Sequence, residues 1–370
     1  MSAPAVRPQI RFVQSRDGVR LAYAASGQGE PVIVKAATWL SHLELDWGSP
    51  VWRHLLESLS SLGRFVRYDE RGCGLSDWTV PDLGFERWVE DLEQVVDTLG
   101  AARFVLVGIS QGAAVAIAYA VRHPGRVSHL VLHGGYARGR LVRGGTPADR
   151  DEAEMMARLA ALGWGKADPS FRQFFTTQFI PGGTPEQHEW FNEAESRSTS
   201  PENAARFMRE FNAIDVTGLL AQVRCPTLVT HSRHDVRVPF DEGRLMAGTI
   251  PGARFVPIDS GNHLLLGHEP GWRVWLDAVR AFLPRAAGDD RFATLSPRQR
   301  EILALVAQGR DNLQIAAALG LSEKTVRNQV SAILDRLEVA NRSQSCWRAK
   351  AGWPGTSDPE PAPAPQAGCG

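Results

Sequence analysis

With 370 residues, the chain is long enough to bury a large core and to form about two domains. Its 41 Lys and Arg balance 41 Asp and Glu, so overall charge does not point to nucleic acid or to an acidic surface as partner. The four cysteines are scattered without a C-x-x-C spacing, which argues against zinc and a disulfide framework, and we expect no metal and no cofactor.

The chain begins with MSAPAVRPQ, which lacks the hydrophobic core of a signal peptide. No apolar run approaches the ~20 residues that cross a membrane. We therefore expect a soluble, cytoplasmic protein that has no membrane as partner. The first structure predicted is a hairpin, because apolar runs at 10–14 and 19–24 flank Arg16-Asp17-Gly18.

Strand and helix patterns then alternate along the chain. We predict strands at 32–35, 64–68, 104–107, 127–133, 227–231 and 253–258, and helices at 52–62, 85–99, after Gly112 and at 272–282. Such alternation is typical of a parallel sheet that helices cover on both faces, so the fold class is α/β.

A helical segment interrupts this alternation at about 137–216. It is rich in aromatic residues, most of which we expect to form the core of an inserted subdomain. A subdomain inserted over an active site would also present some of these rings to a ligand. The sequence therefore predicts a helical cap within a domain that extends over residues 1–285.

A serine stands at the turn between an apolar strand and an Ala-rich helix, in the sequence Gly108-Ile109-Ser110-Gln111-Gly112. This turn requires small neighbours, because its backbone is strained and the helix packs close to the sheet. It exposes the Ser110 hydroxyl and places the Gln111 amide at a helix N-terminus, where an oxyanion is stabilised. The motif alone also fits an ordinary Gly-rich turn; the strand before it and the helix after it favour a nucleophile.

Partners for such a serine follow two later strands. Asp235 comes after the strand at 227–231, and His263 comes after the strand at 253–258. The ends of these strands share one edge of the sheet, and the chain order Ser, Asp, His is the one expected for this architecture.

On these residues the chain resembles the α/β-hydrolase family over roughly residues 10–283. The stretch Asp69-x-Arg71-Gly72-x-Gly74-x-Ser76 is also similar to the stretch after that family's fourth strand. The resemblance implies that Ser110 is the nucleophile, His263 the general base and Asp235 the acid.

Other residues compete for these roles. His268 lies five residues beyond His263, and Asp259 follows a different strand from Asp235. The spacing of His231 and His234 suggests metal ligands, but without a further cluster we interpret them as ordinary loop histidines and expect no metal site.

The oxyanion hole departs from the family pattern. The family often has His-Gly after the third strand, whereas this chain has Ala36-Ala37. We expect the backbone amides of Thr38 and Gln111 to form the hole. Alanine lacks the conformational freedom of glycine, so the triad alone leaves open whether the site turns over substrate.

The C-terminal part of the chain differs in charge. Residues 292–350 hold nine Lys and Arg against five Asp and Glu, a net of +4, so the remainder carries −4. Helix start signals occur at Ser296-Pro297, Asp311, Ser322 and Asn341, which predicts a small all-α domain of four helices at 292–351. A polar linker at 286–291 precedes it, and we expect the Pro-Ala tail at 352–370 to be disordered.

This domain resembles the LuxR/GerE-type helix-turn-helix. The resemblance rests on Leu295-Ser296-Pro297-Arg298-Gln299-Arg300-Glu301, Gly309, Asn312, Ile315-Ala316, Leu319-Gly320, Ser322 and Lys324-Thr325-Val326. An apolar stripe leaves one polar helix face for double-stranded DNA, formed by Lys324, Thr325, Arg327, Asn328 and Ser331. Gln329 stands where the family often has His, and the resemblance implies that the helix from Asn341 forms a homodimer.

Two functions fit the sequence. The first is a DNA-binding transcriptional regulator whose hydrolase-like domain senses or processes a small molecule. The second is an active serine hydrolase, acting on an ester or lactone, with an accessory DNA-binding domain. A pure interaction scaffold would not need three triad residues in order.

Overall fold

A computed structural model describes residues 8–284 and 295–337. They belong to two compact units, Met1–Pro284 and Arg285–Gly370. The linker predicted at 286–291, the tail at 352–370 and the helix from Asn341 lie outside the described residues.

The first unit is built on an eight-stranded sheet in the described chain, with the order β1-β2-β4-β3-β5-β6-β7-β8. Its strands are β1 Gln9–Gln14, β2 Arg20–Ser26, β3 Val32–Lys35, β4 Arg64–Tyr68, β5 Phe104–Ile109, β6 Val127–His133, β7 Thr227–Ser232 and β8 Arg254–Ile258. β1 and β2 form the predicted antiparallel hairpin, β2 pairs antiparallel with β4, and the remaining pairs are parallel. The predicted strands are confirmed, with ends that move by one or two residues.

The burial of the strands agrees with their order in the sheet. Every residue of β5 is buried, as is every residue of β3 and β7, which suits strands covered on both faces. β1 at the edge has only exposed and half-buried residues. The serine turn therefore leaves the sheet from one of its most enclosed strands.

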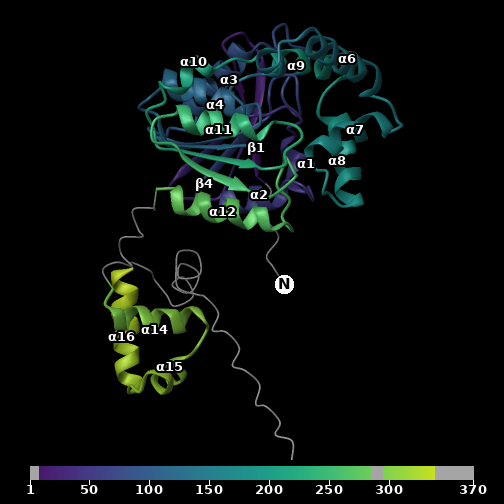
Figure 1. The fold of residues 1–370 in the computed structure, drawn as a ribbon. Coiled ribbons are helices and arrows are strands. Elements are labelled where there is room, and N and C mark those ends of the chain that lie inside the picture. Colours follow the sequence, from purple (N-terminus) through teal and green to yellow (C-terminus); the bar gives the residue numbers. More distant parts are fainter. Residues whose placement is uncertain (1–7, 285–294, 338–370) are drawn as a thin grey trace, which may run out of the picture. The chain divides into compact units, whose positions relative to one another are not determined.

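Helices cover both faces of the sheet, as the α/β class requires. In Figure 1, α2 and α12 lie on one side of it and α3, α4 and α11 on the other. The helices before β6 and after β7 in this unit are α1 Leu43–Trp47, α2 Arg53–Leu62, α3 Phe85–Asp97, α4 Gly112–Arg122, α11 Phe240–Thr249 and α12 Pro270–Phe282.

Two of these helices, α1 and α11, were not predicted from the sequence. α11 contains Gly243 and Gly248, which weaken a helical pattern. Gly243 has a packing reason, since a Cβ there would lie 2.7 Å from Nδ1 of His231. The close approach of α11 to β7 thus requires a residue that lowers helix propensity.

Six helices of the described chain make up most of the connection between β6 and β7. They are α5 Arg140–Arg143, α6 Pro147–Gly163, α7 Ser170–Phe179, α8 Pro185–Ser198, α9 Pro201–Ala213 and α10 Thr217–Leu220. We call α5 to α9 the cap. α6 and α8 begin with capping boxes at Thr146 and Thr184, each followed by Pro at the start of the helix.

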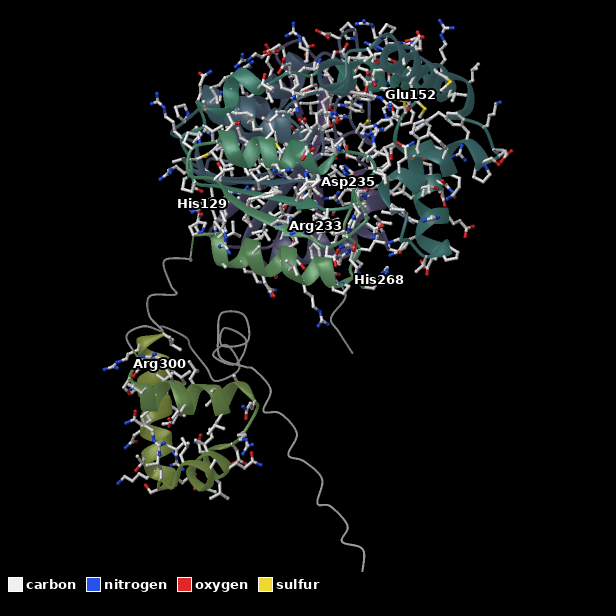
Figure 2. The ribbon with its side chains drawn as sticks, viewed as in Figure 1. His129, Glu152, Arg233, Asp235, His268 and Arg300 are labelled. Carbon is white, nitrogen blue, oxygen red and sulfur yellow. The ribbon has the colours of Figure 1, made fainter. Side chains whose placement is uncertain are left out.

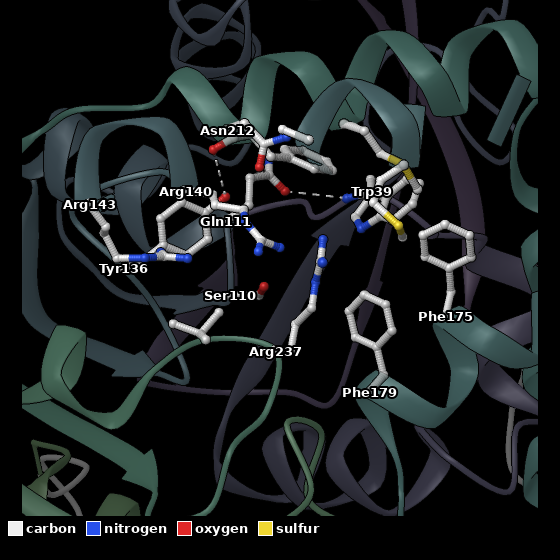
Figure 3. A pocket seen from close by; sticks show the side chains of 15 residues that line it. Trp39, Ser110, Gln111, Tyr136, Arg140, Arg143, Phe175, Phe179, Asn212 and Arg237 are labelled. Carbon is white, nitrogen blue, oxygen red and sulfur yellow. Dashed lines mark hydrogen bonds between the residues drawn. The ribbon is translucent and has the colours of Figure 1, made fainter. Parts of the chain in front are cut away.

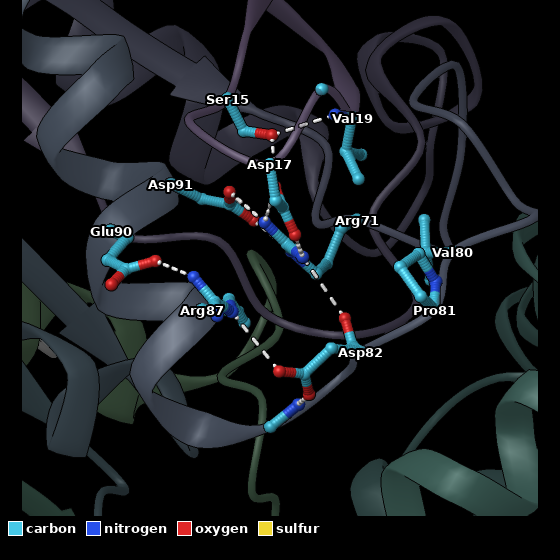
Figure 4. A network of polar contacts seen from close by, with 12 residues as sticks. Ser15, Asp17, Val19, Arg71, Val80, Pro81, Asp82, Arg87, Glu90 and Asp91 are labelled. Carbon is cyan, nitrogen blue, oxygen red and sulfur yellow. Dashed lines mark hydrogen bonds and ion pairs between the residues drawn. The ribbon is translucent and has the colours of Figure 1, made fainter.

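Arg71 is buried and ties the hairpin to α3 through ion pairs (Figure 4). Its guanidinium lies 2.7 Å from Oδ2 of Asp17, in the hairpin turn, and 2.6 Å from Oδ1 of Asp91, in α3. The hydrogen bond from Arg71 holds the pKa of Asp17 well below its usual range. The Arg71-Gly72 motif therefore has a structural role in this fold.

The second unit contains the described helices α14 Pro297–Ala307, α15 Asn312–Leu319 and α16 Glu323–Arg336. Ser296 and Asp311 form capping boxes, and Ser322 caps α16, as predicted. Ile302, Val306, Ile315 and Val330 belong to its small core. Among the described helices, none has both the length and the apolar character needed to cross a membrane.

Candidate active site and nucleic-acid interface

Ser110 stands at the sharp turn between β5 and α4, with a left-handed φ of 52°. That conformation is strained for a residue with a side chain, and it is typical of a nucleophile elbow. Both flanking glycines are required by space: a Cβ on Gly108 would lie 2.6 Å from Cα of Ala113, and one on Gly112 would lie 2.9 Å from the carbonyl oxygen of Ala37. The sequence motif thus produces the turn that aims Ser110 out of the sheet.

Asp235 and His263 form a buried pair at the ends of β7 and β8. Nδ1 of His263 lies 2.7 Å from Oδ2 of Asp235, and both side chains are fully buried. Oδ1 of Asp235 accepts hydrogen bonds from the amides of Arg237 and Val238, at 2.8 and 3.0 Å. Burial raises the pKa of Asp235, but the charge and hydrogen bond of His263 and the Val238 amide outweigh it and lower the pKa overall.

The Gly134-Gly135 dipeptide after β6 lies beside both the Asp235–His263 pair and Ser110. A Cβ on Gly134 would lie 3.3 Å from Cε1 of His263, and one on Gly135 would lie 3.4 Å from the carbonyl oxygen of Ser110. Nε2 of His263 is buried and has no hydrogen-bond partner among the described residues. Ser110 and the Asp235–His263 pair therefore lie against the same dipeptide, and the histidine has an unpaired ring nitrogen.

The competing residues lie elsewhere. His268 is exposed at the periphery of the domain (Figure 2). Asp259 is almost fully exposed and lies 3.6 Å from His234, which is also exposed. His231 is not a loop histidine as expected: it lies within β7, and its Nε2 is 3.0 Å from the carbonyl oxygen of Val238.

The two predicted oxyanion residues differ in position. Gln111 and Thr38 are both buried; Gln111 borders the cavity in front of Ser110, and Oγ1 of Thr38 lies 3.4 Å from Nζ of Lys35. Trp39, the next residue, borders the cavity instead of Thr38, and its amide lies 3.4 Å from Oε1 of Gln111. Sequence patterns do not predict this position of Trp39, because it depends on the loop that continues to Leu40, with a φ of 64°.

The side chain of Gln111 is hydrogen-bonded to Glu70. Nε2 of Gln111 donates to Oε1 of Glu70 over 2.8 Å, and both side chains are buried. Burial raises the pKa of Glu70 to about 8. A carboxyl group that is neutral at pH 7 therefore fixes the side chain of the residue after the nucleophile.

The cavity in front of Ser110 has a volume of about 70 Å³. Figure 3 shows Arg140, Arg143 and Tyr136 on one side of Ser110, Trp39, Phe175 and Phe179 on the other, and Arg237 between them. Except for Trp39, Tyr136 and Arg237, these residues come from the cap. The cap therefore supplies much of the wall that faces the serine.

In the second unit, α16 presents the face predicted to bind DNA. Lys324, Thr325, Arg327, Asn328 and Ser331 are all exposed. On the opposite face, Val326, Val330 and Ile333 are buried. Arg327 forms an exposed ion pair with Glu323 over 2.8 Å, one helical turn away. The five predicted side chains thus share one solvent-facing surface.

Gln329 belongs to a different environment. Its Oε1 accepts a hydrogen bond from Nε2 of Gln299, in α14, over 3.2 Å. Gln299 is buried and also caps α14 from the N3 position. Gln329 therefore helps to join α16 to α14.

Comparison with known proteins places both units in families. Residues 43–270 match the alpha/beta hydrolase fold family, and residues 293–349 match the luxR family of bacterial regulatory proteins. The two matches follow one another along the chain, as the sequence predicts.

Relatives of the first unit are numerous. The AB hydrolase superfamily protein YisY of Bacillus subtilis (strain 168) is 28% identical over 269 residues, 68% of this chain and 91% of that protein. A hydrolase from Pseudomonas aeruginosa PA01 has a similar structure, with a TM-score of 0.62 at 25% identity, over 74% of this chain and 98% of its own. A malate-bound thermophilic esterase from Thermogutta terrifontis has a TM-score of 0.59 at 27% identity, over 74% of this chain and 97% of its own.

Proposed function

Since the chain belongs to the alpha/beta hydrolase fold family and carries a DNA-binding domain of the luxR family, we propose that it controls transcription in response to a small molecule. In this proposal the small molecule is sensed or processed at Ser110, and α16 contacts double-stranded DNA. We further propose that the protein acts in the cytoplasm as a homodimer. The observation that carries the proposal is the pairing, in one chain, of the Ser110 site with a regulatory DNA-binding domain.

The proposed chemistry is acyl transfer to the serine. Nε2 of His263 accepts the proton of the Ser110 hydroxyl as Oγ attacks the carbonyl carbon of an ester or lactone. His263 then protonates the leaving alkoxide, and an acyl-serine remains. Asp235 holds the imidazole through Nδ1 and stabilises the imidazolium that forms, which agrees with its lowered pKa.

We propose that amides at the start of α4 and in the loop after β3 stabilise the tetrahedral intermediate. The Gln111 amide, at the N-terminus of α4, is the first. For the second, the candidates are the Thr38 amide, which the sequence predicts, and the amide of Trp39, a residue that borders the cavity. That amide lies 3.4 Å from Oε1 of Gln111, a long hydrogen bond that an oxyanion would replace with a stronger one.

The second candidate function is an active serine hydrolase with an accessory DNA-binding domain. The buried Asp235–His263 pair and the strained Ser110 favour it. The two functions are compatible, since an acylated serine is also a ligand-bound state. They are distinguished by whether DNA binding depends on occupation of the site.

A fluorophosphonate probe tests the serine chemistry. We expect the folded full-length protein to be labelled, and Ser110→Ala and His263→Ala to abolish labelling. His268→Ala is the matched control, because His268 is exposed and away from the site, and it should be labelled like the wild type. A folded wild type that stays unlabelled would sink the catalytic hypothesis and leave sensing without covalent chemistry.

DNA binding with and without a metabolite extract tests the regulatory part of the proposal. We expect the extract to change the affinity of the full-length protein for its operator. An extract that changes nothing in the wild type, while Ser110 is labelled, would favour the hydrolase with an accessory domain.

A further inference from the structure

The cavity in front of Ser110 is chemically two-sided. Its apolar side includes Trp39, Phe175 and Phe179, and its polar side includes the guanidinium groups of Arg140, Arg143 and Arg237 (Figure 3). Arginine side chains in such a small space concentrate positive charge beside the serine. A wall that only served an uncharged ester would not need them.

The charges of Arg143 and Arg237 lack an acidic partner. In residues 8–284 and 295–337, neither forms an ion pair with a carboxylate. Arg237 donates to Oε1 of Gln178 over 3.3 Å and lies over the Phe179 ring, and Arg143 donates to the Arg138 carbonyl over 2.7 Å. Burial lowers the pKa of both arginines, which nevertheless remain charged at neutral pH.

The carboxylates nearest to this wall are already occupied. Asp235 binds His263. Glu242 pairs with the guanidinium of Arg138 and accepts hydrogen bonds from the backbone amides of Ala137 and Arg138. Glu152 pairs with Arg140 at the surface. A negative charge to balance Arg143 and Arg237 is therefore left to a ligand.

We propose that the cavity takes an ester or lactone that also carries a carboxylate, and that Arg143 and Arg237 bind this carboxylate. The inference rests on the proposed function of Ser110 and specifies its substrate class. The carboxylate occupies the arginine side of the cavity, the apolar part of the acyl chain lies against Phe175 and Phe179, and the scissile carbonyl lies at Ser110. Planar guanidinium groups suit a planar carboxylate, since each offers paired N–H donors.

The backbone fixes the position of Arg237 relative to the reacting atoms. Its amide donates to Oδ1 of Asp235 over 2.8 Å, and Oδ2 of Asp235 holds His263. The loop after β7, which orients His263 through Asp235, therefore also positions Arg237, the residue proposed to bind the carboxylate of the ligand. Substitution of the Arg237 side chain leaves this backbone hydrogen bond in place.

A matched pair of esters tests the proposal. Mono(4-nitrophenyl) adipate and 4-nitrophenyl hexanoate have acyl chains of equal length and differ in a terminal carboxylate. We expect kcat/KM for the full-length protein to be about 10- to 100-fold higher for the adipate ester, as for a charge-assisted hydrogen bond. Arg237→Gln and Arg143→Gln should each lower this ratio, and Arg237→Lys should restore part of it.

Arg158→Gln is the matched control, because Arg158 is an exposed arginine of the cap that pairs with Glu154. It should leave the ratio unchanged. Equal kcat/KM for the two esters in the wild type would overturn the proposal, and so would arginine variants that lower both values by the same factor.

A binding measurement separates this inference from the proposed chemistry. Calorimetric titration of Ser110→Ala with monomethyl adipate and with dimethyl adipate needs no turnover. Tighter binding of the monoester, lost in Ser110→Ala/Arg237→Gln, supports the carboxylate site even if the wild type hydrolyses neither nitrophenyl ester. Equal binding of both compounds overturns it, even if Ser110 proves to be a nucleophile.

Discussion

The amide of His263 donates a hydrogen bond to the carbonyl oxygen of Phe179 over 2.9 Å, and the two rings lie 5.6 Å apart. Phe179 is the last residue of α7 in the cap, so this contact joins the cap to the loop that holds the candidate base. The amide of Leu264 donates to the same oxygen over 3.1 Å. A movement of α7 would therefore displace the backbone of His263, to which Phe179 is hydrogen-bonded.

Phe179→Ala should affect both the stability of the protein and the reactivity of Ser110, although Phe179 belongs to the cap. The buried ring packs against His263 and under Arg237, so its removal leaves a cavity beside both. We expect a loss of about 3–5 kcal/mol in the free energy of unfolding and slower fluorophosphonate labelling of Ser110. Phe174→Ala on the same helix is the control, since that ring is 53% exposed, and its labelling rate should match the wild type.

The ion pairs of Arg71 predict that substitution of this residue, which does not border the cavity, strongly lowers the free energy of unfolding. Arg71→Leu leaves the carboxylate of Asp91 buried without its cation, and we expect a loss of about 3–5 kcal/mol in the free energy of unfolding. Arg87→Leu removes pairs with Asp82 and Glu90 that are partly exposed, and it should lower the free energy of unfolding much less than Arg71→Leu. Denaturant titrations that give equal losses for both variants would contradict this assignment.

Glu70 predicts a specific dependence of stability on pH. Its pKa is about 8 in the folded protein against 4.5 for the unperturbed group, because of burial. The folded protein therefore retains a proton that the unfolded chain releases, and Glu70 makes the protein less stable as the pH rises from about 4.5 to 8. Glu70→Gln keeps an acceptor for Gln111 but has no such proton.

Stability curves at several pH values check this prediction. The stability of Glu70→Gln relative to the wild type should increase from pH 5 to pH 7, by an amount on the order of 3 kcal/mol at pH 7. Urea titrations give the values. Wild-type and variant curves that run parallel over this range would show that Glu70 is ionised in the folded state.

Sequence patterns could predict those features whose causes are local. The turn at Ser110 follows from two glycines beside a serine, and the caps of α14 to α16 follow from Ser296, Asp311 and Ser322. These residues act on backbone within four positions of themselves. The pattern alone was therefore sufficient to place them.

Features produced by packing between distant segments could not be predicted in this way. Arg143 and Arg237 stand 94 positions apart, in the cap and in the loop after β7, and border the same cavity only because the chain folds. In a chain with 37 arginines, the type of residue alone gives no signal. The choice between Thr38 and Trp39 likewise depends on a loop conformation that their sequence does not specify.

The exposed face of α16 predicts two distinct effects on DNA binding. Lys324→Ala and Arg327→Ala should weaken binding to all sequences and reduce the salt slope by about 1 each, as expected for phosphate contacts. Asn328→Ala should instead relax the preference at one base pair by about 1–3 kcal/mol. Gln329→Ala is the control, since its side chain bonds to Gln299, and base preference should stay as in the wild type.

Fluorescence anisotropy at several salt concentrations, with operator and random duplexes, measures both effects. If Lys324→Ala changed sequence preference and left the salt slope unchanged, the phosphate assignment would be wrong.

The last prediction joins the two units by thermodynamic linkage. If a ligand at Ser110 changes the affinity for operator DNA by some factor, the DNA must change the affinity for that ligand by the same factor. Typical couplings of about 1–3 kcal/mol correspond to about 5- to 150-fold. Monomethyl adipate, once its binding is established, should therefore titrate with different affinities in the presence and absence of operator. The Arg237→Gln variant should lose this difference together with the binding, whereas Arg158→Gln should keep it. Identical ligand affinities with and without DNA in the wild type would show that the two units work independently, because a ligand shifts an equilibrium only by binding one state more tightly than the other.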